Sequence, residues 1–309
     1  MEHTQKLLKD FTVIDFSHRL PGPMSSLILK NLGAKVIKIE DQKFQDSFLS
    51  GLFADFDSNF KDWYKELNKD KEIVRLDFKS DNIKNELAPY IDKADMIIMS
   101  LPEKLKVKCG LTNEDLNKSY NSKAIIEMLA SKSTVSAMHD LNAMAVAGIL
   151  TLHAFERTED ILAPPFLPFA GINFGHKVAT DLIACCLLAK TSNKNIFHTS
   201  YLLETTQELY SPFFKNTKGE RKKFLHNGLY PCYCMYRTKD DKYVALAAVE
   251  EKFWNRFVEV FKVDVSTQNR FNKEKLYFEK ISKVFKSMTI DEIDSLNENE
   301  NFCLSTIDW

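Results

Sequence analysis

The feature of this sequence that most constrains its fold is a strand–helix–strand pattern over residues 12–40. Thr12 to Phe16 form a short apolar run that predicts a strand, and Pro21 to Pro23 predict a turn. The apolar residues from Met24 to Leu32 then recur at helical spacing, and residues 34–40 predict a second strand. Because two strands joined by a helical crossover run parallel, the pattern predicts a parallel sheet.

The same pattern recurs further along the chain. Residues 73–78 and 94–99 predict strands, and the residues between them predict a helix. Residues 1–130 therefore predict a doubly wound, Rossmann-like α/β fold with a parallel sheet. Helical patterns over residues 141–155 and 177–190 follow, and a proline-rich loop separates them.

The pattern changes again near the C-terminal end. Residues 233–248 predict a β-hairpin, and helices are predicted at 251–262 and 273–287. A chain of 309 residues also exceeds what one hydrophobic core usually serves. We therefore expect a large α/β domain over residues 1–220 and a smaller α+β domain over residues 221–309.

Charge and composition restrict the partners and the location of the protein. The chain has 42 Lys and Arg against 43 Asp and Glu, so we expect no nucleic-acid partner. We expect no membrane span, because no apolar run approaches about 20 residues. The cysteine spacing fits neither a disulfide scaffold nor a zinc site, so we expect no metal. The N-terminus mixes both charge signs, unlike a targeting peptide, which predicts a cytoplasmic protein and leaves the mitochondrial or peroxisomal matrix open.

Short motifs in a fixed order carry a resemblance to a known family. They lie at residues 13–17 (Val-Ile-Asp-Phe-Ser), 21–23, 32–40, 67–71, 76–77, 94–95, 109–111, 139–142 (His-Asp-Leu-Asn), 236–238 and 247–253. Together they resemble the alpha-methylacyl-CoA racemase and class III CoA-transferase (CaiB/BaiF) family, and the racemase branch most. The resemblance implies the fold predicted above, acyl-CoA thioesters as ligands and a homodimer of interlocked subunits. Relative to the family, the small domain looks shortened after residues 302–306.

The resemblance also implies catalytic roles. His139 matches the histidine that removes the α-proton in racemases, and Glu250 matches the glutamate that partners it. Racemisation needs two bases, one on each face of the reacting carbon. The family's second base is an aspartate in a loop that opens a helix, and Asn173 stands at that position, where an amide has no basicity near neutral pH. Asp181 and His176 are possible substitutes, and a helix-capping or core role is the alternative reading of His139.

The family places basic residues near the nucleotide phosphates of CoA, and Lys38 and Lys71 match those positions. With them, Asp140 in the His-Asp-Leu-Asn motif is a predicted ligand-binding residue. No cofactor is required beyond the CoA thioester itself. Lysines at strand ends are more often solvated, and Asp70 replaces an expected glycine beside Lys71.

Three functions follow in order. The first is a racemase-like isomerase of lipid metabolism that acts on 2-methylacyl-CoA thioesters by removing and returning the α-proton. The second is a partly degenerate homologue, a possible pseudoenzyme, which binds CoA or a protein partner without turnover. The third is a class III CoA-transferase, which Asn173 disfavours because an amide cannot form the acyl intermediate that a carboxylate nucleophile forms.

Overall fold

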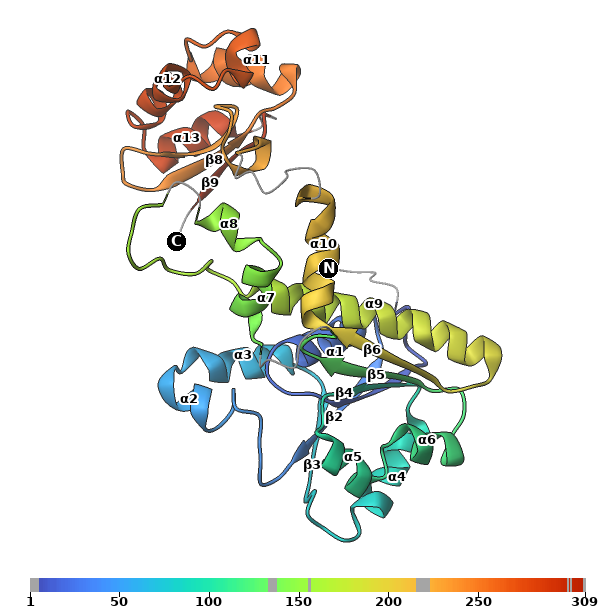
Figure 1. Ribbon diagram of the computed structural model, residues 1–309. Coiled ribbons are helices and arrows are strands. Elements are labelled where there is room, and N and C mark those ends of the chain that lie inside the picture. The colour runs from blue at the N-terminus through green and yellow to red at the C-terminus, as the bar shows by residue number, and fades with distance from the viewer. Residues whose placement is uncertain are drawn as a thin grey trace. The chain divides into compact units, whose positions relative to one another are not determined.

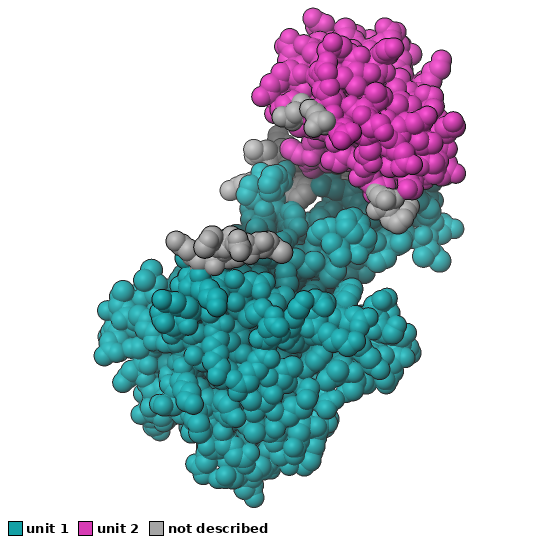
Figure 2. Space-filling view, turned by 180° about the vertical axis from the view of Figure 1, so that it is seen from behind, with its two compact units in different colours: residues 1–218 teal, residues 219–309 magenta. Residues whose placement is uncertain are grey.

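The computed structural model describes residues 6–132, 138–154, 157–214, 223–298, 300 and 302–307. The chain divides into two compact units, residues 1–218 and residues 219–309, which are shown in different colours in Figure 2. Each unit has its own hydrophobic core, so each is described by itself.

The first unit is built around a six-stranded sheet in the order β3-β2-β1-β4-β5-β6, in which every pair of neighbours is parallel. The predicted doubly wound α/β fold is therefore confirmed. The chain builds the sheet outward from β1 in one direction and then from β4 in the other, so the winding reverses between these two strands. The strands are β1 (Thr12–Phe16), β2 (Lys35–Asp41), β3 (Glu72–Leu76), β4 (Met96–Met99), β5 (Ala124–Leu129) and β6 (Ile196–Tyr201).

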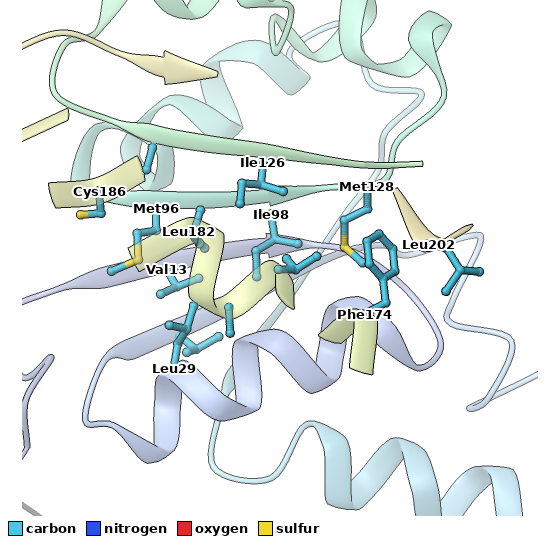
Figure 3. Close-up of a cluster of buried hydrophobic side chains, with 14 of the residues drawn as sticks. Val13, Leu29, Met96, Ile98, Ile126, Met128, Phe174, Leu182, Cys186 and Leu202 are labelled. Atoms are coloured by element: carbon cyan, nitrogen blue, oxygen red, sulfur yellow. The ribbon is translucent and has the colours of Figure 1, made fainter. Parts of the chain in front are cut away.

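Helices cover both faces of this sheet (Figure 1). One face packs against α4 (Ile83–Lys93), α5 (Glu103–Cys109) and α6 (Asn113–Ser119), and the other against α1 (Pro21–Asn31) and α9 (Phe169–Ser192). Figure 3 shows the second layer, where side chains of α1 and α9 meet those of the central strands. The central strands are buried on both faces, which explains why they read as nearly continuous apolar runs rather than as alternating ones.

The structure corrects two local predictions. Pro21 and Gly22 do not form a turn before the helix, because they are the first residues of α1, where proline is favoured since its missing N–H would have no partner. The helix predicted over residues 141–155 is two helices, α7 (Asp140–Val146) and α8 (Leu150–His153). They are separated at Gly148, whose φ of 85° interrupts a right-handed helix.

Helix α9 is longer than the helix predicted over residues 177–190. It begins at Phe169, directly after Pro168, so Asn173 lies inside a helix and not in a loop that precedes one. By length and composition alone α9 could cross a membrane, with a mean hydropathy of 1.3, although the sequence showed no uninterrupted apolar run of that length. Its buried side chains belong to the core of the first unit, which is the arrangement of a core helix in an α/β protein.

Residues 41–66 gave no clear pattern in the sequence. The structure forms two helices there, α2 (Leu52–Phe56) and α3 (Asn59–Leu67). The sequence analysis also did not predict β6 or the helix that follows it, α10 (Leu202–Phe214).

The second unit combines a small antiparallel sheet with helices. The predicted hairpin is confirmed as β7 (Tyr233–Arg237) and β8 (Tyr243–Ala247), and β9 (Leu304–Ile307) adds a third strand that the sequence analysis missed. The core between sheet and helices is rich in aromatic rings, among them Trp254 and Phe257. The helices are α11 (Glu251–Phe261), α12 (Lys275–Phe285) and α13 (Ile290–Asn297).

The crossing of α1 and α9 generates the first testable prediction. A Cβ atom added at Gly175 would lie 2.9 Å from the carbonyl oxygen of Pro21 and 2.9 Å from Cβ of Met24. Gly175→Ala gains about 1 kcal/mol of helix propensity but costs up to about 3 kcal/mol in overpacking. We expect a net loss of about 1 kcal/mol in urea unfolding, whereas Thr180→Ala on the exposed side of α9 should change little. An unchanged or higher stability of Gly175→Ala would contradict this close packing.

Candidate functional site

A cavity of about 930 Å³ lies in the first unit at the carboxyl ends of the central strands. Its lining includes Ser17 and His18 directly after β1, Ser100 directly after β4, and Met128 to Ala130 at the end of β5. The winding of the sheet reverses between β1 and β4, and in open α/β sheets ligands bind outside the strand ends at that point. The cavity therefore occupies the position that the topology favours for a ligand.

A cluster of buried charged side chains supports the loop that forms one side of the cavity. Asp15 in β1 accepts a hydrogen bond from the backbone N–H of Ser17 at 2.8 Å and bonds from the hydroxyl groups of Ser17 and Ser26. Burial by itself raises the pKa of Asp15, but the ammonium groups of Lys38 and Lys71, together with the two hydroxyls, hold that pKa below its usual value. Asp15 is therefore a buried carboxylate that fixes the start of the loop after β1.

The two lysines predicted to contact phosphates belong to this cluster. Lys71 Nζ donates to Pro23 O at 2.8 Å, to Ser26 Oγ at 2.8 Å and to Asn68 Oδ1 at 3.1 Å, and it lies 3.9 Å from Asp15 Oδ2. Lys38 Nζ donates to the carbonyl oxygen of Ser17 at 2.5 Å. Both side chains are fully buried, so the alternative that these lysines are solvated is wrong. A phosphate could reach either ammonium group only if the cluster opened.

A second carboxylate ties the loop after β1 to the segment after β2. Asp46 is fully buried, and its Oδ2 accepts the backbone N–H of Arg19 at 2.7 Å. Its Oδ1 accepts the backbone N–H of Phe48 at 3.0 Å. Arg19 adopts a left-handed conformation with φ of 67°, which is uncommon for a residue with a Cβ atom and requires support from its surroundings. Asp46 supplies that support.

His139 and Asp140 lie together at the start of α7 and line the cavity. His139 is exposed and occupies the N-cap position, so the helix-capping interpretation describes its backbone while its side chain faces the cavity. Asp140 Oδ1 accepts the backbone N–H of Gly171 at 2.7 Å in the first turn of α9. Burial raises the pKa of Asp140, and the N–H groups of Gly171 and Ala170 partly oppose that rise. Asp140 therefore joins the starts of two helices beside His139.

The other predicted catalytic positions do not line this cavity. Asn173 Nδ2 donates to the hydroxyl oxygen of Tyr210 in α10 at 2.9 Å. Asp181 forms an ion pair with Lys177 at 2.6 Å, so neither Asp181 nor the exposed His176 is placed by the cavity as a substitute base. Glu250 precedes α11 in the second unit, and its pairing with His139 stays a prediction.

The structure places a second imidazole at the cavity, and the sequence analysis did not single it out. His18 follows β1 and lines the cavity with His139. Burial is the largest influence on the pKa of His18 and lowers it, as does Lys38, whereas Asp46, Glu40 and Asp15 raise it; the net pKa is below the usual value. The signal available in the sequence was its place, because the first residues after a central strand line the crevice of a doubly wound fold.

Metal ligation finds no support among the side chains whose placement is described. In that part of the chain, no three His, Cys, Asp or Glu residues come together in a way that could hold a metal ion. The chemistry of the cavity is therefore argued below from imidazole, carboxylate and backbone groups.

These features, a doubly wound sheet with a cavity at its reversal point and a small second unit, define a class of nucleotide-type α/β proteins. The chain belongs to CoA-transferase family III, whose model matches residues 8–308. The predicted family is thereby confirmed. The chain is 24% identical to the mouse alpha-methylacyl-CoA racemase over 259 residues, which are 80% of this chain and 63% of the racemase. It thus spans just under two thirds of the length of that relative.

Solved structures of family proteins share the fold. A CaiB/BaiF family protein from Brucella suis superposes with a TM-score of 0.77 at 16% identity, covering 99% of this chain and 85% of the other. The protein Rv3272 from Mycobacterium tuberculosis superposes with a TM-score of 0.72 at 17% identity, covering 98% of this chain and 82% of the other. At such identities the likeness concerns the fold alone.

The buried ion pair between Lys71 and Asp15 gives a stability prediction. Lys71→Met leaves the carboxylate of Asp15 without one of its two cations in a site that water does not reach, and we expect a loss of about 3 kcal/mol in urea unfolding. Lys30→Met removes a pair with Asp70 that is largely exposed and should cost far less. Combining Lys71→Met with Asp15→Asn should cost less than the sum of the two single changes. Additive losses would show that the pair is not coupled.

The lowered pKa of His18 gives a pH prediction. Since the folded pKa lies below the unfolded value, the unfolded chain binds more protons in acid, so the contribution of His18 to stability is present above about pH 6.5 and is lost as the pH falls. Between pH 7.5 and 5.5 the wild type should lose on the order of 1 kcal/mol more unfolding free energy than His18→Gln. His176→Gln, a change at an exposed histidine, should follow the wild type. Equal pH dependence of wild type and His18→Gln would refute the assignment.

Proposed function

We propose that this protein binds acyl-CoA thioesters and exchanges the proton on the α-carbon, racemising 2-methylacyl groups. The observation that carries the proposal is that two imidazoles, His18 and His139, line one cavity at the reversal point of the sheet. Membership of CoA-transferase family III and the similarity to a protein named alpha-methylacyl-CoA racemase support the choice of substrate class.

The reaction requires two groups that exchange protons with one carbon. One neutral imidazole accepts the α-proton and becomes an imidazolium, while the electron pair of the C–H bond passes into the thioester as an enolate. The imidazolium on the opposite face then donates its proton to the same carbon and becomes neutral. No atom is gained or lost, and the two histidines have exchanged protonation states. Burial disfavours the charged form of His18, so this imidazole is suited to begin as the base.

Recognition of the CoA part is proposed to differ from the family pattern on which it was predicted. Lys38 and Lys71 would act by fixing the loop after β1 and not by touching phosphate, because both are enclosed by protein partners. Among the residues that line the cavity, Arg19 carries an exposed guanidinium, which suits a phosphate group. No cofactor beyond the CoA thioester takes part in this scheme.

A second candidate function is binding of CoA without turnover, and the observation that favours it is Asn173. The amide at this position is engaged with Tyr210 and cannot act as the carboxylate base or nucleophile. Transfer of CoA through an acyl intermediate on this residue is disfavoured for the same reason.

The homodimer implied by the family is proposed on a further observation. Large apolar side chains are exposed on α9 and α10, and such patches commonly mark interfaces between proteins. They include Leu187 and Leu188 of α9, and Leu209 and Phe213 of α10. Light scattering of the purified protein tests this proposal, and a monomeric mass at micromolar concentration would contradict it.

Isotope exchange separates the two candidate functions. In D2O the wild type should incorporate deuterium at the α-carbon of a chiral 2-methylacyl-CoA and invert its configuration, as read by mass spectrometry and chiral chromatography. His18→Gln and His139→Gln should each lower inversion about 10²- to 10⁴-fold, because each removes one of two proton carriers. His176→Gln, outside the cavity, should leave the rate unchanged.

The outcomes are distinct. CoA binding without any exchange by the wild type would support the non-catalytic candidate and reject the racemase. Exchange that survives in both histidine variants would reject the two imidazoles as the proton carriers.

A further inference from the structure

A group of four aromatic rings forms one wall of the cavity. The rings are those of Phe48, Phe53, Phe60 and Trp63, and we call this group the aromatic wall. It comes from the segment after β2 and from α2 and α3, the part of the chain that gave no pattern in the sequence. Centroids of contacting rings lie between 4.8 Å for Phe48 and Phe60 and 6.1 Å for Phe48 and Trp63. The five contacts are tilted or edge-to-face, the geometries that aromatic rings prefer.

The aromatic wall is anchored to the rest of the unit from behind. Phe48 is buried with Tyr64 and Leu67, and residues of α1, including Met24 and Leu27, pack against this cluster. The hydroxyl of Tyr64 also donates to Glu40 in β2 at 2.9 Å. The wall is therefore a fixed surface. Phe53 and Phe60 are only half-buried and Trp63 is 40% exposed, so apolar ring surface faces the cavity.

The rest of the lining indicates which part of an acyl-CoA this wall suits. Other walls carry apolar side chains as well, among them Met128, Phe174 and Leu202, which Figure 3 shows at the edge of the core. The permanent cation among the lining residues is Arg19. A nucleotide with three phosphate groups needs more positive charge than that, whereas an uncharged acyl group needs none.

Resting on the proposed function, we infer that the aromatic wall is the acyl subsite and that it selects acyl groups carrying an aromatic ring. Four mutually packed rings present faces and edges in fixed orientations, and a fifth ring from a ligand can extend the same edge-to-face packing. A flexible alkyl chain fills apolar volume equally well but gains nothing from this geometry. The wall lies in the same cavity as His18 and His139, so a ring held there would place the thioester near the proton carriers.

The test uses two thioesters that differ only in the ring. Both are N-acetylcysteamine thioesters, which lack the nucleotide part of CoA, one of 2-methyl-3-phenylpropanoic acid and one of 2-methyl-3-cyclohexylpropanoic acid. Calorimetry on the full chain should show tighter binding of the phenyl compound by about 3- to 10-fold. Phe60→Leu and Phe53→Leu keep an apolar side chain and should remove most of that preference. Equal or tighter binding of the cyclohexyl compound by the wild type would overturn the inference.

The chain offers a matched control for these variants. Phe56 belongs to α2, is 83% exposed and does not line the cavity, so Phe56→Leu should keep the phenyl preference. Urea unfolding of each variant confirms that the wall still folds. A loss of preference in Phe56→Leu equal to that in Phe60→Leu would overturn the assignment to the wall.

Failure of this inference and failure of the proposed function give different results. If CoA thioesters do not bind but the short phenyl thioester binds selectively, the subsite stands and the CoA proposal fails. If CoA thioesters bind and the short thioesters show no preference for phenyl, the subsite fails alone. If Phe60→Leu weakens adenosine 3′,5′-bisphosphate and not the phenyl thioester, the wall holds adenine and the inference is overturned.

Discussion

The buried charge cluster around Asp15 is the constraint on which the rest of the site depends. It joins β1 and the loop after it to α1 and to the loop before β3, since Asp15 lies near Lys71 and Lys71 bonds to residues of both. Buried ion pairs contribute little net stability, because desolvation offsets attraction. Their effect is to define one arrangement, since any other leaves a charge unpaired in the interior. The loop at the reversal point of the sheet is fixed in this way.

Much of the fold could be predicted from the sequence, because its central strands and helices are set by local hydrophobic patterns. Residues 12–40 gave β1, α1 and β2 to within a few residues. The failures have physical causes. Pro21 reads as a turn, but it is also favoured at the first position of a helix. Strand β9 depends on pairing with β8, a contact between distant parts of the sequence that no local pattern records. Residues 41–66 form helices whose apolar faces pack on α1, and short helices of this kind carry a weak pattern.

The site was predicted less completely, because sequence similarity names residues and not their surroundings. His139 was expected at a ligand site, and its ring does line the cavity. Lys38 and Lys71 were chosen by position, and only the structure shows that buried carboxylates and carbonyl oxygens already hold them. Asn173 was expected in a loop and lies inside α9, because the helix starts directly after Pro168. His18 was passed over since a histidine after a strand is informative only once the strand is known to be central.

Asp46 connects the two functions proposed for the cavity. One of its oxygens holds the backbone of Arg19 in the loop that carries His18, and the other holds the backbone of Phe48 where the aromatic wall begins. The proton-carrying loop and the wall therefore share one buried support, and their separation is fixed before any ligand arrives. A ligand anchored by a ring at the wall would have its α-carbon held at a set position relative to His18. Binding energy from a remote group is then used to orient the reacting atoms, which is how remote contacts raise the rate of a chemical step.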